Sequence, residues 1–389
     1  MVDCFAYVEP MVMLKRSARM KETCWSFEEY CDDLGPAKIV HLYDPTCGLR
    51  GIVVIDNIAC GPAIGGVRMA ADVSTREVFR LARAMTFKNA AAGLPHGGGK
   101  AGILADPRTP EKARLIRAFA HAIRDLVEYI PGPDMGTDET CMGWIHDKIK
   151  RAVGLPRVLG GIPLDEIGAT GFGLAECAEV AAASCGLTLK GATVAIEGFG
   201  NVGKHAATFL QHKGATLVAA SDSRGTMYDP RGISVADLVE AKAESGSVLG
   251  YAEGKKLGQE EIFGLPCDIL IPAARPDCIH LNNVDSIQAK LILQGANIPA
   301  TPEAETILHQ RGILTIPDFI ANAGGVICAS VEYHGGNEAQ AFQAISEKIR
   351  RNTEEVLMRS LKKKIEPRKA AMDLSRERVL QAMTFRSCD

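Results

Sequence analysis

The chain has 389 residues, which exceeds the usual size of a single α/β core and predicts two domains with a cleft between them. Its 44 lysines and arginines nearly balance 47 aspartates and glutamates, so charge gives no sign of a nucleic-acid or membrane partner. The twelve cysteines form no C-x-x-C pair, which predicts reduced thiols and no metal site. No apolar run reaches the roughly 18 residues that span a bilayer. The N-terminus lacks a signal-peptide pattern, so we expect small-molecule chemistry in the cytoplasm.

The N-terminal part alternates short β-rich runs with helical patterns, and its first twenty or so residues receive no assignment. Ser74 and Glu77 have the spacing of a capping box, which predicts a helix from about Thr75. The expected elements are strands over 39–43 and 52–55, a turn at Gly65 and Gly66, a helix over 75–92, a glycine loop over 95–99, a strand over 100–104 and a helix over 110–129. The rigid turn Pro131–Pro133 then places Asp134 on a loop, and helical segments follow over 140–153.

A dinucleotide-binding unit is predicted after a helix over 171–186. The β-rich run 193–197 leads into Gly198, Gly200 and Gly203 in G-F-G-N-V-G, and a helix over 204–213 follows. A second strand ends in Asp222, nineteen residues after Gly203, which is the spacing of a βαβ dinucleotide fold. Gly198 permits a tight turn, Gly200 lets the backbone approach the pyrophosphate, and Gly203 lets helix and strand pack closely.

The cofactor is expected to be NAD, because Asp222 would accept hydrogen bonds from the ribose hydroxyls and repel a 2′-phosphate. Ser223 and Arg224 follow at once and could bind that phosphate, so NADP stays open. Asn201 and Val202 complete the expected glycine turn. Further parallel strands are predicted near 268–272 and 290–294, with ends that face the cofactor.

Several motifs together resemble the glutamate/leucine/phenylalanine/valine dehydrogenase family, and their order and spacing match from about residue 27 to the end. The motifs are G-G-V-R at 65–68, M-T-F-K-N at 85–89, G-L-P-H-G-G-G-K at 93–100, G-P-D at 132–134, G-F-G-N-V-G at 198–203, G-A-N at 295–297 and N-A-G-G-V at 322–326. The resemblance implies reversible oxidative deamination of an L-amino acid to a 2-oxo acid and ammonia. It also implies a homo-oligomer.

The resemblance assigns a role to three residues. Lys88 would hold the substrate α-carboxylate, Lys100 would polarise the carbonyl and activate water, and Asp134 would shuttle a proton to and from the substrate nitrogen. Lysine suits the second role only with a lowered pKa, which a neighbouring cation such as Lys88 in a water-poor cleft provides. On the same resemblance, Thr170, Asn297 and Asn322 contact the nicotinamide side of the cofactor, although each could instead cap a helix or form a turn.

The sequence departs from glutamate-specific members, which resemble K-G-G at the first glycine pair and carry a serine three residues after the valine of N-A-G-G-V. Here Ile64 precedes Gly65 and Gly66, and Ala329 holds the later position. Burial of an unpaired carboxylate against two apolar residues costs several kcal/mol. These residues therefore predict leucine, valine or phenylalanine as substrate. Glutamate stays the alternative, because the segment 221–230 is closer to glutamate dehydrogenases and Arg68 or Arg275 could supply the charge.

We therefore predict an α/β protein of two domains. Residues 1–167, with C-terminal helices over 335–389, would form a substrate-binding and oligomerisation domain with a mixed sheet, and residues 168–334 a Rossmann-type dinucleotide domain. A helix over 338–359 is expected to cross back to the first domain, and hinge motion is expected near Gly168 and Gly335–Gly336. A nucleotide sensor or assembly protein without activity is the third alternative, which the presence of Lys88, Lys100 and Asp134 disfavours.

Overall fold

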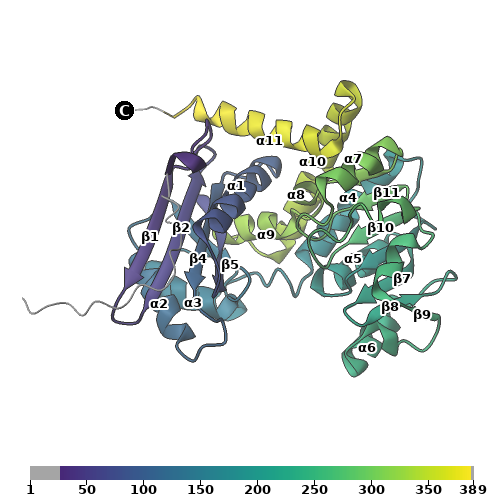
Figure 1. Cartoon of the computed structure of the whole chain (residues 1–389), viewed down its shortest axis with the longest axis horizontal. Coiled ribbons are helices and arrows are strands. Elements are labelled where there is room, and N and C mark those ends of the chain that lie inside the picture. Colours follow the sequence, from purple (N-terminus) through teal and green to yellow (C-terminus); the bar gives the residue numbers. More distant parts are fainter. Residues whose placement is uncertain (1–26, 387–389) are drawn as a thin grey trace, which may run out of the picture.

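The computed structural model describes residues 27–386, and the chain forms two parts that each contain one β-sheet (Figure 1). The expectations for the first twenty residues lie outside this range. Among the described residues, no helix combines the length and the apolar composition that a bilayer crossing requires. The chain is an α/β protein with two sheets, as the sequence predicts.

The first sheet is mixed and has the strand order β1-β2-β4-β3-β5. Its strands are β1 (Lys38–Asp44), β2 (Leu49–Asn57), β3 (Ala63–Ala70), β4 (Gly97–Leu104) and β5 (Tyr129–Pro133). The β1/β2 and β2/β4 pairs are antiparallel, whereas β3 runs parallel to both β4 and β5. Helix α1 (Thr75–Ala91) covers one face, and α2 (Lys112–Ala122) and α3 (Glu139–Ile149) cover the other, which gives three layers.

The second sheet has the strand order β12-β11-β10-β6-β7-β8-β9. Its strands are β6 (Thr193–Glu197), β7 (Thr216–Asp222), β8 (Gly225–Tyr228), β9 (Lys255–Leu257), β10 (Ile269–Pro272), β11 (Leu291–Leu293) and β12 (Leu314–Ile316). The strands from β12 to β7 are parallel, and β8 and β9 add an antiparallel edge. The strand order reverses at β6, which is the place where doubly wound folds bind their ligands.

Helices of the second part pack on both faces of this sheet, and short 3₁₀ helices occur in both parts of the chain. The α-helices are α4 (Ala169–Ser184), α5 (Asn201–His212), α6 (Val235–Ser245), α7 (Pro302–Gln310), α8 (Asp318–Ala321), α9 (Gly324–Tyr333), α10 (Glu338–Lys363) and α11 (Pro367–Met383). The 3₁₀ helices are Phe27–Tyr30, Arg157–Leu159, Val248–Gly250, Gln259–Gly264 and Val284–Ser286.

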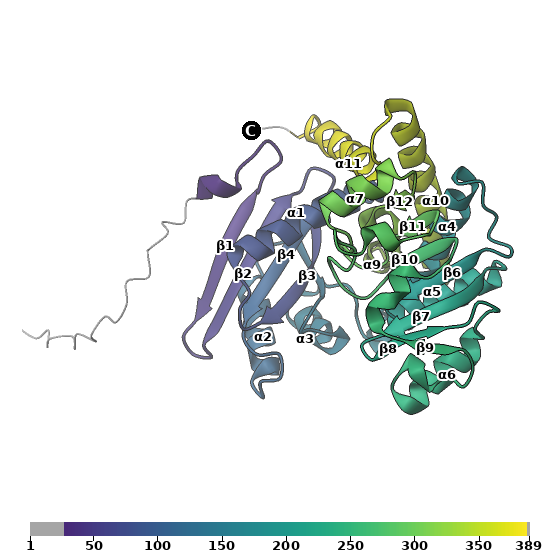
Figure 2. The ribbon, with the colours of Figure 1, turned by 45° about the vertical axis from the view of Figure 1, so that its right-hand side comes forward.

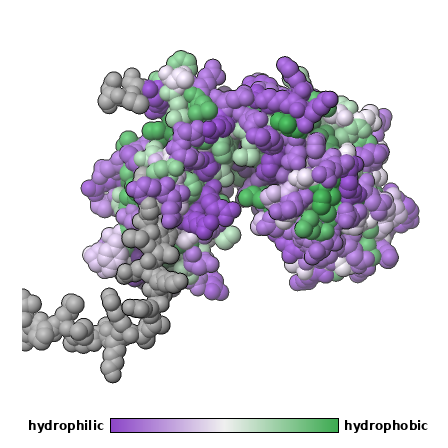
Figure 3. All heavy atoms as spheres, turned by 45° about the horizontal axis from the view of Figure 1, so that its top comes forward, coloured by the Kyte–Doolittle hydropathy of each residue, from purple (hydrophilic) through white to green (hydrophobic). Residues whose placement is uncertain are grey.

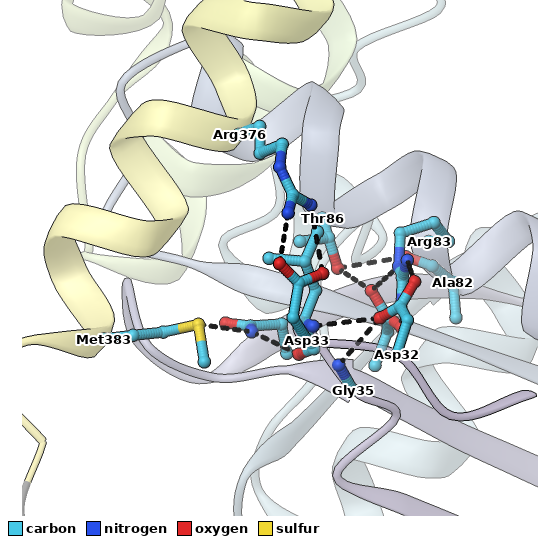
Figure 4. Close-up of polar contacts among 11 residues, drawn as sticks. Asp32, Asp33, Gly35, Ala82, Arg83, Thr86, Arg376 and Met383 are labelled. Carbon is cyan, nitrogen blue, oxygen red and sulfur yellow. Dashed lines mark hydrogen bonds and ion pairs between the residues drawn. The ribbon is translucent and has the colours of Figure 1, made fainter. Parts of the chain in front are cut away.

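The last helix returns to the first part, as Figures 1 and 2 show. Helix α10 packs mainly along α4 and touches the first part at Gly93, where Lys348 Nζ donates a 3.0 Å hydrogen bond, so the helix over 338–359 makes only part of the expected return. Helix α11 lies against α1 instead, because a left-handed residue at Lys364 (φ 55°) ends α10 and turns the chain. Arg376 on α11 pairs with Asp33 (Figure 4). Beside this pair, Arg83 on α1 binds Asp32.

Three predicted turns are strands in the structure. Gly65 and Gly66 lie inside β3, the glycine loop forms the start of β4, and Pro131–Pro133 forms most of β5. The glycines serve a close approach of the two strands, because a Cβ on Gly65 would lie 1.6 Å from the Gly99 carbonyl oxygen. The prolines are tolerated because β5 is the edge strand of its sheet.

Candidate active site

The predicted lysine and aspartate form a direct ion pair across β3, which lies between β4 and β5 in the first sheet. Lys100 Nζ lies 2.9 Å from Asp134 Oδ2. Lys100 comes from the middle of β4, and Asp134 follows β5 directly. The lysine is only 7% exposed, so its charge lies in a water-poor environment. Both residues that the sequence assigns to proton transfer therefore meet at one point.

The glycine pair of β3 provides room for this ion pair. A Cβ on Gly66 would lie 2.7 Å from the Asp134 Cβ and 3.2 Å from Lys100 Nζ. The Gly65 carbonyl accepts a 2.8 Å hydrogen bond from the buried Tyr129 hydroxyl, which fixes β3 against β5. The segment of β3 beside the two charged groups therefore has no side chains at Gly65 and Gly66. A substrate can approach Lys100 and Asp134 along the backbone of β3.

Lys88 reaches across from the first part of the chain to the second. It lies near the end of α1, and its Nζ donates a 2.6 Å hydrogen bond to Asn322 Oδ1. The Asn322 amide nitrogen in turn donates to Asn297 Oδ1 at 3.1 Å and to the Gly295 carbonyl at 3.2 Å. Because Gly295 and Asn297 follow β11, Lys88 lies at the carboxyl edge of the second sheet.

The two lysines titrate abnormally, and burial is the main cause for each. Burial lowers the pKa of Lys88 to about 8; Lys100 acts in the same direction and Asp318 opposes it. Burial also lowers the pKa of Lys100, although Asp134 opposes that shift. Burial alone would raise the pKa of Asp134, but Lys100 and Arg68 together hold it below its usual value. With its pKa at about 8, Lys88 loses its proton much closer to neutral pH than a free lysine does.

An apolar wall borders this site. Ile64 on β3 and Ala329 on α9 belong to one buried cluster with Ile130 and Val153, and Met85 packs against it. Ile64 is 4% exposed and Ala329 is 7% exposed. The two positions that the sequence sets apart from glutamate-specific enzymes therefore do meet, and they form an apolar surface.

The alternative cations for a substrate carboxylate already have acidic partners. Arg68 pairs with Asp134 and, at 2.5 Å, with Glu77. Arg275 pairs with Glu260 and lines the cavity at the end of β6. The serine that follows Ala329 is also engaged, because Ser330 Oγ lies 3.0 Å from His96 Nε2.

A separate cavity of about 580 Å³ opens at the carboxyl ends of β6, β7 and β10. Gly198, Gly200, Asp222 and Ser223 line it, and Asn201 lines the adjoining hollow. Thr170 lies apart from this cavity, on α4, where a Cβ on Gly325 would come within 3.3 Å of its Oγ1.

The glycine turn fits a dinucleotide closely. Gly198 has a φ of +91°, and a Cβ there would lie 2.6 Å from the Ala274 Cβ. A Cβ on Gly203 would lie 2.0 Å from the Gly198 carbonyl oxygen, whereas one on Gly200 would meet nothing within 4 Å. Val202 packs against the core and can offer only its backbone. This surface ends at the start of α5, where unpaired N–H groups suit a pyrophosphate.

Asp222 differs from the expected free acceptor, because protein groups already bind its carboxylate. It accepts hydrogen bonds from the Val248 amide at 2.7 Å and the Ser247 hydroxyl at 3.1 Å. Lys242 Nζ lies 3.7 Å away. Burial would raise the pKa of Asp222, but these donors lower it, so the group is ionised and partly compensated. This arrangement weakens the repulsion of a 2′-phosphate on which the NAD preference was based.

Sequence reasoning missed some residues that complete the site. Glu77 was predicted to close a capping box, yet its carboxylate binds Arg68, although Ser74 does cap α1 by accepting from the Glu77 amide. His96 was not singled out, but its ring joins Ser330 on α9 to the Pro62 carbonyl. Burial and His334 lower the pKa of His96 to about 4, so the ring is neutral at pH 7. Its place beside the glycine motif was the only signal for it.

The surface is hollowed between the two parts of the chain (Figure 3), and the lysine and asparagine contact crosses between these parts. A Rossmann sheet on one side of the hollow and a buried lysine–aspartate pair on the other define a class of enzyme. The class is that of nicotinamide-dependent dehydrogenases with a proton-transferring site.

Comparison with known proteins identifies the family within this class. The model of the glutamate/leucine/phenylalanine/valine dehydrogenase family matches residues 160–387, and the model of its dimerisation domain matches residues 36–151. The chain belongs to this family, as the sequence motifs predict. It is accordingly an NAD(P)-dependent amino-acid dehydrogenase that acts on the CH–NH₂ group of its substrate.

Three similar curated proteins are glutamate dehydrogenases. Glutamate dehydrogenase of Aeropyrum pernix is 41% identical over 356 residues, which cover 85% of each chain. An NADP-specific glutamate dehydrogenase of Saccharolobus shibatae is 38% identical, with 85% and 83% coverage. An NAD-specific one of Staphylococcus aureus is 36% identical, with 85% and 84% coverage. The expected cofactor class, NAD(P), is therefore confirmed.

Solved structures share the architecture. The hetero-hexameric glutamate dehydrogenase of Thermus thermophilus, in a leucine-bound form, is 31% identical with a TM-score of 0.80 and 91% coverage of both chains. The L-tryptophan dehydrogenase of Nostoc punctiforme is 25% identical, with a TM-score of 0.72 and coverage of 90% and 97%.

Proposed function

We propose that the chain catalyses the reversible oxidative deamination of L-glutamate to its 2-oxo acid and ammonia. The name that the relatives share supports glutamate, and the apolar preference predicted from the sequence receives no support from them. The single observation that carries the reaction type is the buried contact of Lys100 with Asp134, in the part of the chain from which Lys88 reaches the carboxyl edge of the nucleotide sheet.

The residues of the site can perform each proton step. Lys88, as a cation, binds the α-carboxylate of the substrate. Its ammonium group then gives up the hydrogen bond to Asn322. Asp134, held ionised, accepts a proton from the substrate nitrogen. Lys100 activates a water molecule at the iminium carbon, for which its lowered pKa is suited. Bound NAD(P) supplies the hydride acceptor, and the Gly198–Gly203 turn and Asp222 would hold it.

A second candidate is an L-amino acid with an apolar side chain. One observation favours it, since Ile64, Ala329, Ile130 and Val153 present no charge to a substrate side chain. An apolar side chain would gain about 1.5–3 kcal/mol from burial at such a wall. A side-chain carboxylate would need a cation there, and both Arg68 and Arg275 have acidic partners.

A substrate panel separates the two candidates. The purified chain is assayed at the reduced-nicotinamide absorbance band with glutamate, leucine, valine and phenylalanine, each with NAD and with NADP. A higher kcat/KM for glutamate supports the proposal, and a higher value for an apolar substrate replaces it with the second candidate. Inactivity with every pair would contradict both and favour a sensor or assembly role.

We also propose that the chain forms a homo-oligomer. The first part matches the family's dimerisation domain, and the structural relative from Thermus thermophilus is described as hetero-hexameric. The proposed boundary near residue 168 is supported by the two sheets, which lie on either side of it, and the assignment of the C-terminal helices to the first domain is supported by the packing of α11 on α1. Hinge motion near Gly168 (φ 72°) and Gly335 (φ 76°) would close the hollow during the reaction.

A further inference from the structure

The acid of the ion pair contacts two cations through the same oxygen. Asp134 Oδ2 lies 2.9 Å from Lys100 Nζ and 3.1 Å from Arg68 Nε. The Arg68 guanidinium extends further to Glu77 Oε1 at 2.5 Å. Four alternating charges therefore form a continuous chain from β4 to the first turn of α1.

The register of β3 explains how Arg68 reaches this acid. Residues two apart on a strand point to the same face, so Arg68 and Gly66 share one face of β3. Gly66 has no side chain, and the space beside it contains Lys100 Nζ and the Asp134 side chain. Arg68 is the next residue on that face after Gly66, and its side chain contacts Asp134. The Arg68 side chain is only 18% exposed.

The contact is well suited to fixing an orientation. A guanidinium is planar and always charged, and it binds through several donors in a fixed geometry. Here Nε binds Asp134 and the Nη1 group binds Glu77, so the plane of the guanidinium is set by two carboxylates at once. A lysine at this position could supply the charge but not the two separate contacts.

We propose that Arg68 is the positioning residue of the proton-transfer site, which keeps the Asp134 carboxylate ionised and aimed at the substrate nitrogen, with Glu77 as its anchor. This inference rests on the proposed function, in which Asp134 exchanges a proton with that nitrogen. Arg68 itself touches neither proton nor substrate. It acts on the charges of Asp134, which it contacts, and of Lys100.

The charged and titratable groups around Asp134 set the direction of the effect. They are Lys100 from β4, Arg68 from β3, Glu77 from α1 and Tyr129 from β5. Removal of the Arg68 charge takes away one cation that holds the Asp134 pKa down, and it also relieves repulsion on Lys100. Both pKa values then rise. Removal of the Glu77 charge lowers the Lys100 pKa and leaves the Arg68 charge less compensated, so the shift is opposite.

The test is the pH profile of kcat/KM for the best substrate in the wild type and four variants. Relative to the wild type, Arg68→Gln is expected to move the acidic limb up by about one pH unit, and Glu77→Gln to move it down. Arg68→Lys retains the charge, so its limb stays near that of the wild type while kcat falls by about tenfold or more. Arg50→Gln, an exposed arginine on β2 of the same sheet, serves as the matched control and leaves the profile unchanged.

Folding of each variant is checked by its melting temperature and by titration with reduced nicotinamide cofactor. If Arg68→Gln fails to fold, the proposal is tested by Glu77→Gln alone, whose acidic limb should move to lower pH. Superposition of the Arg68→Gln limb, or of the Glu77→Gln limb, on that of the wild type overturns the inference while the proposed function stands. If Lys100→Ala retains full turnover, the proposed function fails first, which distinguishes the two failures.

Discussion

Lys88 and Asn322, which are 234 positions apart in the sequence, are joined by a 2.6 Å hydrogen bond between the two parts of the chain. The same asparagine binds Asn297 and the backbone after β11. A substrate carboxylate that takes the ammonium from Asn322 would free this amide for a neighbouring ligand. The contact thus couples the proposed substrate group to the edge of the nucleotide sheet.

The first prediction concerns Lys100. Lys100→Ala should lower kcat by about 10²–10⁴-fold, because a positioned general acid or base contributes that much. Binding of reduced cofactor, measured by fluorescence titration, should stay unchanged, since Gly198, Gly200 and Asp222 line a separate cavity. Lys362→Ala, an exposed lysine near the end of α10, is the control and should match the wild type in both measurements. Loss of cofactor binding in Lys100→Ala would point to a structural role.

The second prediction uses the pKa of about 8 for Lys88. A lysine is charged below its pKa, so the affinity for a 2-oxo acid should fall as the pH rises through 8, by about tenfold between pH 7 and 9. A 2-oxo acid has no amine, which removes the titration of the ligand itself. Calorimetric titration with Lys88→Arg should show weaker but nearly pH-independent binding over this range. A wild-type affinity that is constant from pH 7 to 9 would contradict the assignment.

The third prediction concerns the apolar wall. Ile64→Lys combined with Ala329→Ser should raise the ratio of kcat/KM for glutamate to that for leucine by about 10- to 150-fold, since a hydrogen bond to a charge is worth about 1.5–3 kcal/mol. Stability should fall, because Ile64 is 4% exposed and the new ammonium must be desolvated. The ratio is measured with the wild type and both single variants as controls. An unchanged ratio would show that the side-chain pocket lies elsewhere.

The fourth prediction concerns cofactor choice. Asp222→Ser should raise the ratio of kcat/KM with NADP to that with NAD by at least about tenfold, or roughly 1.4 kcal/mol. The substitution removes a negative charge beside the adenosine ribose site and leaves Lys242, which lies 3.7 Å from the carboxylate, without its acidic partner. Asp237→Ser, exposed on α6, should leave the ratio unchanged. Equal losses with both cofactors would assign Asp222 to the loop structure alone.

The fifth prediction concerns stability. Gly65→Ala should lower the free energy of unfolding by about 1–3 kcal/mol or more, because its Cβ would lie 1.6 Å from the Gly99 carbonyl oxygen and the strands must separate. Gly264→Ala is the matched control, since its Cβ would lie 3.7 Å from the Ser286 Cβ, an ordinary contact. Urea denaturation measures both. Equal stability of the two variants would mean that β3 and β4 can shift without cost.

Local sequence patterns predicted the segment from α4 to β7 and the strands β10 and β11 correctly, and they gave no assignment for most of the other elements of the second part. The glycine turn, α5 and the acid that ends β7 could be identified because each has a specific local cause at a fixed spacing. The sequence predicts turns or loops at three segments around the first sheet, because glycine and proline usually mark turns. At Gly65 the cause is instead a partner strand more than thirty residues away, which no local pattern reveals.

The site shows the same limit. Lys88, Lys100 and Asp134 were found through motifs, and the structure brings Lys100 and Asp134 together. The pairing of Glu77 with Arg68 was missed, because the spacing of Glu77 from Ser74 fits a capping box equally well. The choice between these two partners depends on where β3 lies relative to α1, which is a tertiary relationship.

The return of α11 to α1 also limits how the two parts can move. The chain leaves the first part between α3 and α4, and it comes back through α10 and α11, where Arg376 pairs with Asp33. Because two separate segments connect the parts, their relative motion is restricted to rotation about one axis, whereas a single linker would allow rotation about several. Every opening would then bring Lys88 and Asn322 back to the same register, with no search among alternative alignments.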